Sequence, residues 1–363
     1  MRTELGSLTS IKTGKLDANA SSENGIYPFF TCAVEPLKID SYSYDCECVL
    51  VAGNGDLNVK YYNGKFDAYQ RTYIIESKDK SKLTVPYLYY FLESYIETLR
   101  NQSIGGIIKY IKLGNLTNAP IPVLSIKEQN EIVKTLDKAK SIITHIRTQL
   151  EKLDLLVKAR FVEMFGDPVS NPYNWEKISL GKLAEIKIGP FGSLLHKEDY
   201  VQNNHALINP SHIINSKVFA DMKLTVSDEK YEELRAYQLF TGDVVMGRRG
   251  EMGRCAVITE SGLLCGTGSM IIRTNGRLKA DYIQKIISFP SFKKTIEDMA
   301  VGQTMPNLNV PIVSKFMIIC PPIEVQEQYY SFIEKTDKSK VAMQKELGKA
   351  QTLFDSLMQE YFG

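Results

Sequence analysis

Two long stretches of the chain place apolar residues at alternating steps of four and three, which predicts two long helices with one apolar stripe each. The first runs from Ser125 to Met164 without proline or glycine. Its stripe consists of Ile132, Leu136, Ala139, Ile143, Ile146, Leu150, Leu153 and Val157. The second runs from about Glu324 to Tyr361, with a less regular stripe of Tyr329, Phe332, Thr336, Met343, Leu347, Ala350, Leu353 and Leu357. The spacing is typical of a coiled-coil seam.

Neither helix buries its stripe alone, so we expect the two to pair with each other. Each follows its own globular segment, and an antiparallel pair would carry two domains at opposite ends of one rod, related by an approximate two-fold axis. In the alternative arrangement, each helix packs back onto its own domain or forms a homodimer.

The chain also repeats itself in a fixed order. The segment Leu5–Leu8 recurs as Leu180–Leu183, and both copies continue into Ile-Lys-x-Gly. Three further matches follow: Cys48–Gly53 with Asp243–Gly247, Leu83-x-x-x-Tyr87-Leu88 with Leu278-x-x-x-Tyr282-Ile283, and Pro120–Gln129 with Pro321–Gln328. Both helical stretches end in an aromatic residue and glycine, Phe165-Gly166 and Phe362-Gly363. The conserved order indicates an internal repeat.

These patterns divide the chain into four segments: a first domain at 1–124, a helix at 125–165, a second domain at 166–321 and a helix at 322–363. Ser125 and Glu128 form the sequence pattern of a capping box at the start of the first helix. We therefore predict an α+β protein with two α/β domains in tandem, each followed by one long helix of an antiparallel coiled coil.

The Leu-Gly-x-Leu opening, the Pro-Pro-x-x-x-Gln-Glu-Gln start of the second helix and the Phe-Gly endings together resemble the specificity subunits of type I restriction-modification systems. The resemblance covers essentially all 363 residues. It implies that each domain recognises one half of a bipartite site in double-stranded DNA. It also implies that the helices act as a spacer and bind modification (methyltransferase) subunits, two per chain, with restriction subunits joining for cleavage.

Bulk composition limits how such a protein would bind DNA. With 44 basic and 42 acidic residues the net charge is +2, so DNA contacts must come from local patches. Six cysteines without C-x-x-C spacing and four unclustered histidines predict reduced thiols and no metal site. The chain shows no signal-peptide h-region and no apolar run of membrane-spanning length, which predicts a cytoplasmic protein that makes no membrane contact.

The sequence does not indicate an enzyme or a cofactor. It lacks the glycine-rich cofactor loop and the Asn-Pro-Pro-Tyr motif that an adenine methyltransferase needs, and Gly247-Arg248-Arg249-Gly250 is not a P-loop. The nearest strings, Asn171-Pro172-Tyr173 and Cys320-Pro321-Pro322-Ile323, are interpreted as a turn and a helix start. Two alternatives remain: a coiled-coil interaction scaffold without a DNA role, and a DNA-modifying enzyme with unrecognised chemistry.

Candidate DNA contacts are basic and hydrogen-bonding residues on turns between apolar strands. In the first domain they are Lys12, Thr13, Lys15, Asn54, Lys60, Tyr61, Tyr62, Lys65 and Arg71. In the second domain they are Lys187, Ser193, His196, Lys197, Asn209, His212, Arg248, Arg249, Arg254, Thr267, Ser269 and Gln303. In the alternative interpretation the tyrosines pack within hairpins and the lysines are solvated edge charges.

Overall fold

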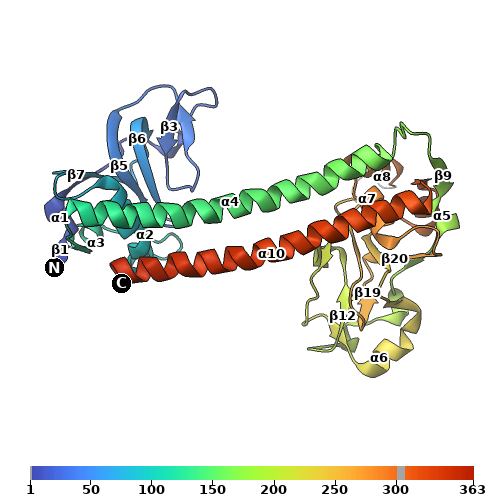
Figure 1. Ribbon diagram of the computed structural model, residues 1–363. Coiled ribbons are helices and arrows are strands. Elements are labelled where there is room, and N and C mark those ends of the chain that lie inside the picture. Colours follow the sequence, from blue (N-terminus) through green and yellow to red (C-terminus); the bar gives the residue numbers. More distant parts are fainter. Residues whose placement is uncertain (1, 301–306) are drawn as a thin grey trace. The chain divides into compact units, whose positions relative to one another are not determined.

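The computed structural model describes residues 2–300 and 307–363 (Figure 1). The chain forms two compact units, Met1–Glu151 together with Lys340–Gly363, and Lys152–Ser339. Two long helices, α4 (Ile126–Phe165) and α10 (Ile323–Phe362), each contribute one part to each unit. Each unit is described below by itself.

The first unit contains a six-stranded sheet and a separate two-stranded one. The strands of the unit are β1 (Arg2–Glu4), β2 (Thr9–Thr13), β3 (Tyr27–Phe30), β4 (Leu37–Ile39), β5 (Tyr44–Ala52), β6 (Val59–Ala68), β7 (Thr72–Ser77) and β8 (Pro120–Pro122). Its helices, besides parts of α4 and α10, are α1 (Leu5–Leu8), the 3-10 turn η1 (Ala18–Ala20), α2 (Val85–Gln102) and α3 (Leu113–Thr117). The strand order is β2-β7-β5-β6-β3-β4, with only the β3–β6 pair parallel, while β1 pairs with β8.

Strand β5 lies at the centre of this sheet with both faces covered. Successive strand residues point to opposite faces. Val49 and Val51 belong to the core under α2, whereas Cys48 and Leu50 belong to a second cluster that contains Phe66. Burial on both faces explains why this strand reads as a continuous apolar run rather than an alternating one.

The second unit contains more, shorter elements. Its strands are β9 (Glu176–Ser179), β10 (Ala184–Ile188), β11 (Tyr200–Val201), β12 (His205–Ile208), β13 (Ile213–Ile214), β14 (Lys217–Val218), β15 (Thr225–Val226), β16 (Gln238–Leu239), β17 (Val244–Gly247), β18 (Cys255–Val257), β19 (Leu263–Cys265), β20 (Ser269–Thr274) and β21 (Met317–Cys320). Its helices are α5 (Leu180–Leu183), η2 (Gly192–Leu194), η3 (Lys197–Asp199), η4 (Pro210–His212), α6 (Asp228–Glu233), η5 (Arg235–Tyr237), α7 (Ala280–Ile287), α8 (Pro290–Met299) and α9 (Val310–Ser314). The sheets are β10-β20-β17-β18, β11-β15-β12-β19-β16, β13-β14 and β21-β9.

The internal repeat predicted from the sequence is confirmed by matching elements. The first unit opens with β1, α1 and β2, and the second with β9, α5 and β10. The Leu-Gly-x-Leu glycine has the same role in both: a Cβ on Gly6 would lie 2.9 Å from the Cβ of Thr117, and one on Gly181 would lie 2.9 Å from the Cβ of Ser314. Only glycine lets α1 approach α3, and α5 approach α9, this closely.

The glycine that closes each Ile-Lys-x-Gly match is also required by packing. A Cβ on Gly14 would lie 2.1 Å from the carbonyl oxygen of Ala68, and one on Gly189 would lie 2.0 Å from that of Gly266. We expect Gly14→Ala and Gly189→Ala each to lower the free energy of unfolding by about 1–3 kcal/mol, because the backbone must move to admit the methyl group. Denaturant unfolding followed by circular dichroism measures this.

Gly348→Ala is the matched control, because Gly348 lies in α10 with nothing within 4 Å of the added carbon. This change should stabilise the protein by about 1 kcal/mol through helix propensity alone. Equal stabilities for all three variants would contradict the packing role of Gly14 and Gly189.

The two long helices pack against each other in opposite directions within each unit, as expected from their apolar stripes and from the order of domains and helices along the chain. In the first unit Leu136, near the start of α4, shares a core with Met358 and Phe362 at the end of α10. In the second unit Phe161 and Phe165, at the end of α4, pack edge-on against Tyr329 near the start of α10, with ring centroids 5.6 and 5.2 Å apart. None of the described helices is long and apolar enough to cross a membrane.

The details of the helix starts and stripes agree with the sequence in all but one position. The capping box is present: the amide of Glu128 donates to the Ser125 hydroxyl at 3.3 Å, and the amide of Ser125 donates to the Glu128 carboxylate at 2.8 Å. The exception is Leu353, which is 56% exposed. Phe354 packs against the core instead, because the steps of three and four from Leu347 and Ala350 continue to Phe354 and Leu357 and pass over Leu353.

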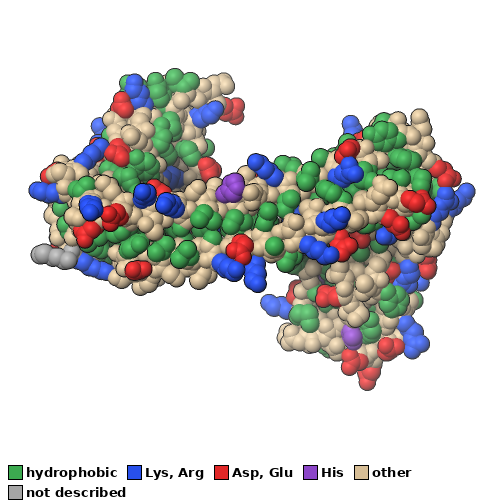
Figure 2. Space-filling model, viewed as in Figure 1, with side chains coloured by type: hydrophobic (Ala, Val, Ile, Leu, Met, Phe, Trp, Pro, Cys, Tyr) green, Lys and Arg blue, Asp and Glu red, His purple; other side chains and the backbone are tan. Residues whose placement is uncertain are grey.

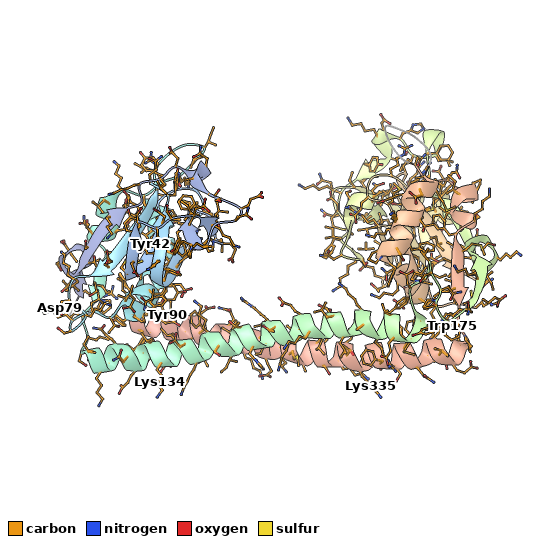
Figure 3. All side chains as sticks on the ribbon, turned by 90° about the horizontal axis from the view of Figure 1, so that it is seen from above. Tyr42, Asp79, Tyr90, Lys134, Trp175 and Lys335 are labelled. Atoms are coloured by element: carbon orange, nitrogen blue, oxygen red, sulfur yellow. The ribbon has the colours of Figure 1, made fainter. Side chains whose placement is uncertain are left out.

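The globular part of each unit also packs onto the long helices. In the first unit Tyr90 of α2, labelled in Figure 3, donates its hydroxyl proton to Asp137 of α4 at 2.5 Å. Lys140 of α4 forms an ion pair with Glu93 of α2 at 3.1 Å. In the second unit the indole N–H of Trp175 donates to the carbonyl of Phe165 at 3.1 Å and satisfies the end of α4. Helix pairing and packing onto the domains therefore occur together.

Candidate nucleic-acid interface

Several turns of the first unit meet where β5 ends. The amide of Gly53 donates to the carbonyl of Arg71 at 2.8 Å, and the carbonyl of Gly53 accepts from the amide of Ile111 at 2.9 Å. Gly14, next to Lys15, donates to the carbonyl of Thr72 at 3.0 Å. The backbone thus brings together the turns that carry Lys15, Asn54 and Arg71. The side chains of Lys15 and Arg71 are exposed there and that of Asn54 is half-buried.

Two other predicted contacts of the first unit, Thr13 and Lys60, lie close to this cluster, and a third, Lys12, forms an ion pair. Thr13 is exposed and directly precedes Gly14. Lys60 is the second residue of β6, beside the same loop, and donates a hydrogen bond to Asn58; burial lowers the pKa of its ammonium group. Lys12 instead pairs with Glu76 at 2.6 Å, and this hydrogen bond raises its pKa.

The aromatic and basic residues further along β6 are placed elsewhere. Tyr61 donates to Glu47 at 2.8 Å, and burial and this hydrogen bond raise the pKa of Tyr61 to about 12. The ring of Tyr62 packs against Phe30 and Phe66, at centroid distances of 5.0 and 5.6 Å. Lys65 lies over the Tyr42 ring at 4.7 Å. These contacts hold the three side chains on the sheet, while Tyr61 and Lys65 remain exposed.

The second unit shows a corresponding convergence at the end of β17. The amide of Arg248 donates to the carbonyl of Gly268 at 3.0 Å, and the carbonyl of Arg248 accepts from the amide of Leu308 at 2.9 Å. The Asn209 side chain accepts from the amide of Gly268 at 3.3 Å. Asn209, exposed Thr267 and the arginine loop therefore lie side by side.

The hydrogen bonds of the two clusters match position by position. Gly53 in the first unit and Arg248 in the second are equivalent. The amide of each donates to the residue just before the neighbouring strand of the sheet, Arg71 or Gly268. The carbonyl of each accepts from a segment that returns to the loop, at Ile111 or Leu308. The next residue in each loop forms an isolated bridge with that segment, Asn54 with Tyr110 and Arg249 with Asn307. This shared pattern of backbone hydrogen bonds, called the backbone frame below, therefore presents the side-chain amide of Asn54 in the first unit and the guanidinium group of Arg249 in the second.

The three arginines of the second loop differ in their partners. Arg248 is half-buried and donates to the Asn307 side chain at 3.2 Å, and burial lowers the pKa of its guanidinium group, with a further contribution from Arg249. Arg249 is exposed. Arg254 donates to Glu251 at 2.6 Å and to the carbonyl of Pro210 at 3.2 Å. Arg254 thus fixes the loop, while Arg249 is the most accessible of the three.

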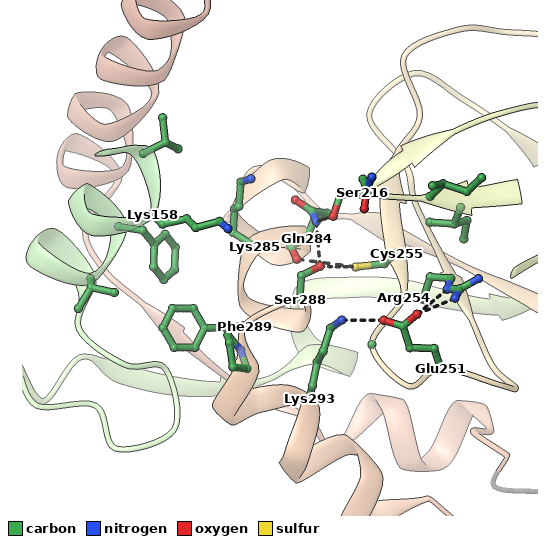
Figure 4. Close-up of a pocket in the computed structure, with 18 of the residues that line it drawn as sticks. Lys158, Ser216, Glu251, Arg254, Cys255, Gln284, Lys285, Ser288, Phe289 and Lys293 are labelled. Atoms are coloured by element: carbon green, nitrogen blue, oxygen red, sulfur yellow. Dashed lines mark hydrogen bonds and ion pairs between the residues drawn. The ribbon is translucent and has the colours of Figure 1, made fainter. Parts of the chain in front are cut away.

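Glu251 anchors the base of this loop beside a cavity of about 630 Å³ (Figure 4). It accepts from Arg254 and, at 3.1 Å, from Lys293 of α8, and these hydrogen bonds lower the pKa of its carboxyl group. The cavity is also lined by Lys158 of α4 and Lys285 of α7. The ion pairs of Glu251 with Arg254 and Lys293 therefore fix the base of the loop, and this limits the positions that the loop arginines can adopt.

Of the other predicted contacts of the second unit, two are buried, one is paired and two are exposed. His212 is buried, with a ring nitrogen 2.9 Å from the carbonyl of Leu207. Ser269 is fully buried in β20. Lys187 pairs with Glu185 at 3.5 Å. His196 and Lys197 are exposed around η3. Ser193 lies in η2, and Gln303 lies outside the described residues.

Sequence reasoning did not identify the returning segment of the first unit as part of the cluster. Residues 104–111 follow α2 and return beside the Asn54 loop, where the carbonyl of Lys109 accepts from the amide of Gly55 at 2.9 Å. The only signal was the Gly105-Gly106 pair between isoleucines, which breaks an otherwise apolar run. In the second unit Asn307 was likewise not identified.

Charge on the viewed face is mixed. Figure 2 shows Lys and Arg side chains over both units, interspersed with acidic ones. This agrees with the nearly balanced composition and leaves the loop clusters as the local groupings of interest. Among the described residues, no group of three or more His, Cys, Asp or Glu side chains is placed to hold a metal ion.

Comparisons with known proteins identify relatives of the whole chain. The family model described as type I restriction modification DNA specificity domain matches residues 2–154 and 172–350. The type I restriction enzyme EcoDI specificity subunit of Escherichia coli is 26% identical over 392 residues, covering 98% of this chain and 85% of that protein. The MjaVIII specificity subunit of Methanocaldococcus jannaschii is 20% identical over 270 residues, covering 69% of this chain and 63% of that protein.

Two solved structures share the fold over the full chain. The S subunit of a type I restriction-modification system from M. genitalium has a TM-score of 0.59 at 16% identity, covering 100% of this chain and 96% of that one. A chain from a structural study of complex assembly and conformational transition of the type I R-M system has a TM-score of 0.64 at 14% identity, covering 100% and 97%.

Proposed function

This chain belongs to the family of type I restriction-modification DNA specificity domains, and we propose that its two loop clusters each recognise one half of a bipartite site in double-stranded DNA. The observation that carries the proposal is the shared backbone frame. Asn54 and Arg249 occupy equivalent positions in the two units. Asparagine suits the edge of adenine and arginine suits that of guanine. One frame with different side chains would give two half-sites of different sequence.

Affinity in this proposal comes from cations around the base-reading positions. In the first unit Lys15, Arg71 and Lys109 are exposed on the turns next to Asn54. In the second unit Arg248 lies next to Arg249 and is oriented by Asn307. Phosphate contacts of this kind fix the position of a protein on the duplex and weaken as salt rises. A small net charge suffices when the cations are grouped locally.

We further propose that α4 and α10 act as a spacer and as the docking surface for modification subunits. Apolar side chains remain exposed on the outer faces of both helices, among them Ile142, Leu155, Leu156, Val341 and Leu353. Exposed apolar groups along a helix pair favour a protein partner. The duplicated architecture offers two equivalent docking places, hence two modification subunits per chain, with restriction subunits joining for cleavage.

In this proposal the chain itself is not an enzyme and needs no cofactor, and it works in the cytoplasm. Asn171, which begins the string closest to a methyltransferase motif, is committed to structure: its side chain bonds both the amide and the carbonyl of Trp175, at 2.9 and 2.8 Å. The purified chain alone should not transfer methyl groups to DNA, and addition of the modification subunit should produce site-specific methylation. Methyl transfer by the chain alone would contradict the adaptor role.

The arginine loop provides a direct test of DNA recognition. We expect Arg248→Ala with Arg249→Ala to weaken binding to the specific site by about 5- to 150-fold, which corresponds to about 1–3 kcal/mol for a good base contact. The fold and the assembly with modification subunits should be unchanged. Fluorescence anisotropy of the assembled complex on a duplex carrying the methylated site measures the affinity across a salt titration.

Arg235→Ala is the matched control, because it removes an arginine from the same unit that is exposed and paired with Glu232 at 3.2 Å. Its effect on affinity should be small. If the double variant bound DNA like the wild-type protein at every salt concentration, the loop would be excluded from the interface.

A further inference from the structure

The tip of the returning segment in the first unit exposes isoleucine side chains to an unusual degree. Ile107 is 104% exposed, Ile108 62% and Ile104 43%. Scattered exposed apolar residues are normal, but adjacent ones at the end of a loop form a patch that water solvates poorly. A tip of this kind indicates a binding surface.

Backbone hydrogen bonds fix the conformation of the tip. The amide of Ile104 donates to the carbonyl of Tyr110 at 3.0 Å, and the amide of Tyr110 donates back at 2.8 Å. Gly105 makes the turn possible with φ at 119°, where a Cβ would lie 2.5 Å from the carbonyl oxygen of Ile108. The loop is thus built to present Ile107 and Ile108 at a fixed place beside the Asn54 loop.

The surroundings of the tip favour DNA as its partner. Lys109 is adjacent and exposed, and Lys15 and Arg71 lie on the neighbouring turns. Asp56, in the same loop as Asn54, is paired with Arg100 at 3.1 Å. The major groove of DNA displays the methyl groups of thymine between two phosphate backbones. An apolar tip bordered by cations and by an asparagine is complementary to such a surface.

We propose that Ile107 and Ile108 recognise thymine at the first half-site by contact with its methyl group in the major groove. This inference rests on the proposed DNA-reading function and deepens it. In the major groove thymine presents a methyl group that apolar side chains contact, whereas cytosine presents a hydrogen there. The isoleucines would then specify A·T pairs without a hydrogen bond, next to the hydrogen-bonding amide of Asn54.

The test combines a protein change with a change of one methyl group in the DNA. Each thymine of the first half-site is replaced by deoxyuridine, and binding of the assembled complex is measured by anisotropy. For the wild-type protein, at least one replacement should weaken binding about fourfold, as expected for one buried methyl group. Ile107→Ser with Ile108→Ser should weaken binding to the thymine duplex by roughly tenfold, and uridine should then cause no further loss.

Two controls separate this mechanism from others. Ile26→Ser removes an isoleucine of the same unit that is 78% exposed, and it should leave both affinity and uridine sensitivity unchanged. Lys109→Ala should reduce the dependence of affinity on salt, whereas the isoleucine variant should not, because methyl contacts release no counterions.

The outcomes are distinguishable. A half-site without thymine, wild-type binding that is insensitive to uridine, or a variant that keeps the wild-type uridine response would overturn the inference while DNA recognition stands. A variant that binds DNA normally but fails to retain the modification subunit would assign the tip to protein docking and also overturn it. Failure of the wild-type complex to bind any specific site would instead refute the proposed function.

Discussion

Replacing residues 170–320 with the matching segment of a related specificity subunit is expected to change one half of the methylated DNA sequence and leave the other half unchanged. The reason is that each loop cluster is assembled from hydrogen bonds within its own unit. The backbone of Arg248 bonds to both Gly268 and Leu308, and all three residues lie inside the exchanged segment. Asn54, Arg71 and Ile111 lie outside it.

The splice points suit this exchange. Strand β9 pairs with β21 from Glu176 opposite Cys320 to Ser179 opposite Met317, so both strands of that ladder are transferred together. The contacts that must be remade include the bond from Trp175 to the carbonyl of Phe165 and the packing of the Tyr282 ring on Phe161 and Phe165. A donor segment that retains the tryptophan and the tyrosine preserves these contacts.

Sequencing of methylated adenines in a host that carries the exchanged gene measures the result. The reciprocal exchange of residues 1–124 is the matched control and should alter the other half of the site. Simultaneous change of both halves in either exchange would contradict modular recognition. Loss of all methylation would be assigned to assembly if the exchanged chain no longer co-purified with its modification subunit.

The repeat and the helix pair could be predicted from the sequence because both depend on local, periodic patterns. The match of Cys48–Gly53 with Asp243–Gly247 identified β5 and β17 as equivalent strands, in which Val49 pairs with Ile75 and Val244 with Ile272. The helix stripe was predicted correctly along α4. Along α10 the prediction was wrong at Leu353, because the regular steps of three and four lead from Ala350 to Phe354 and then to Leu357.

The loop clusters could be predicted only in part, because the sequence does not show which turns meet in space. Lys15, Asn54 and Arg71 converge through backbone hydrogen bonds between turns that are far apart in the chain. Ser269 has the residue type expected of a base-reading group, yet it points into the core of β20. Tyr62 likewise packs inward. Whether such a residue faces the core or the solvent depends on the direction of its side chain on the curved sheet, and composition does not reveal this direction.

Adding one heptad to both long helices is expected to lengthen the unread spacer between the two half-sites by up to about three base pairs. The insertions belong between Glu151 and Lys152 and between Ser339 and Lys340, where each helix passes from one unit to the other. Seven residues add about 10 Å of helix at 1.5 Å per residue, and DNA rises about 3.4 Å per base pair. A heptad in both partners keeps both apolar stripes in phase.

The half-sites themselves should persist, because the insertion touches neither loop cluster. Methylome sequencing reports the half-sites and the spacer in the same experiment, provided that the lengthened chain still co-purifies with modification subunits. Insertion of two residues into each helix is the matched control: at 3.6 residues per turn it rotates each stripe by about 200° and should abolish helix pairing and methylation. Two heptads should add up to about six base pairs. If methylation by the one-heptad variant continued with an unchanged spacer, α4 and α10 would not set the distance between the half-sites, and the spacing would have to come from the modification subunits instead.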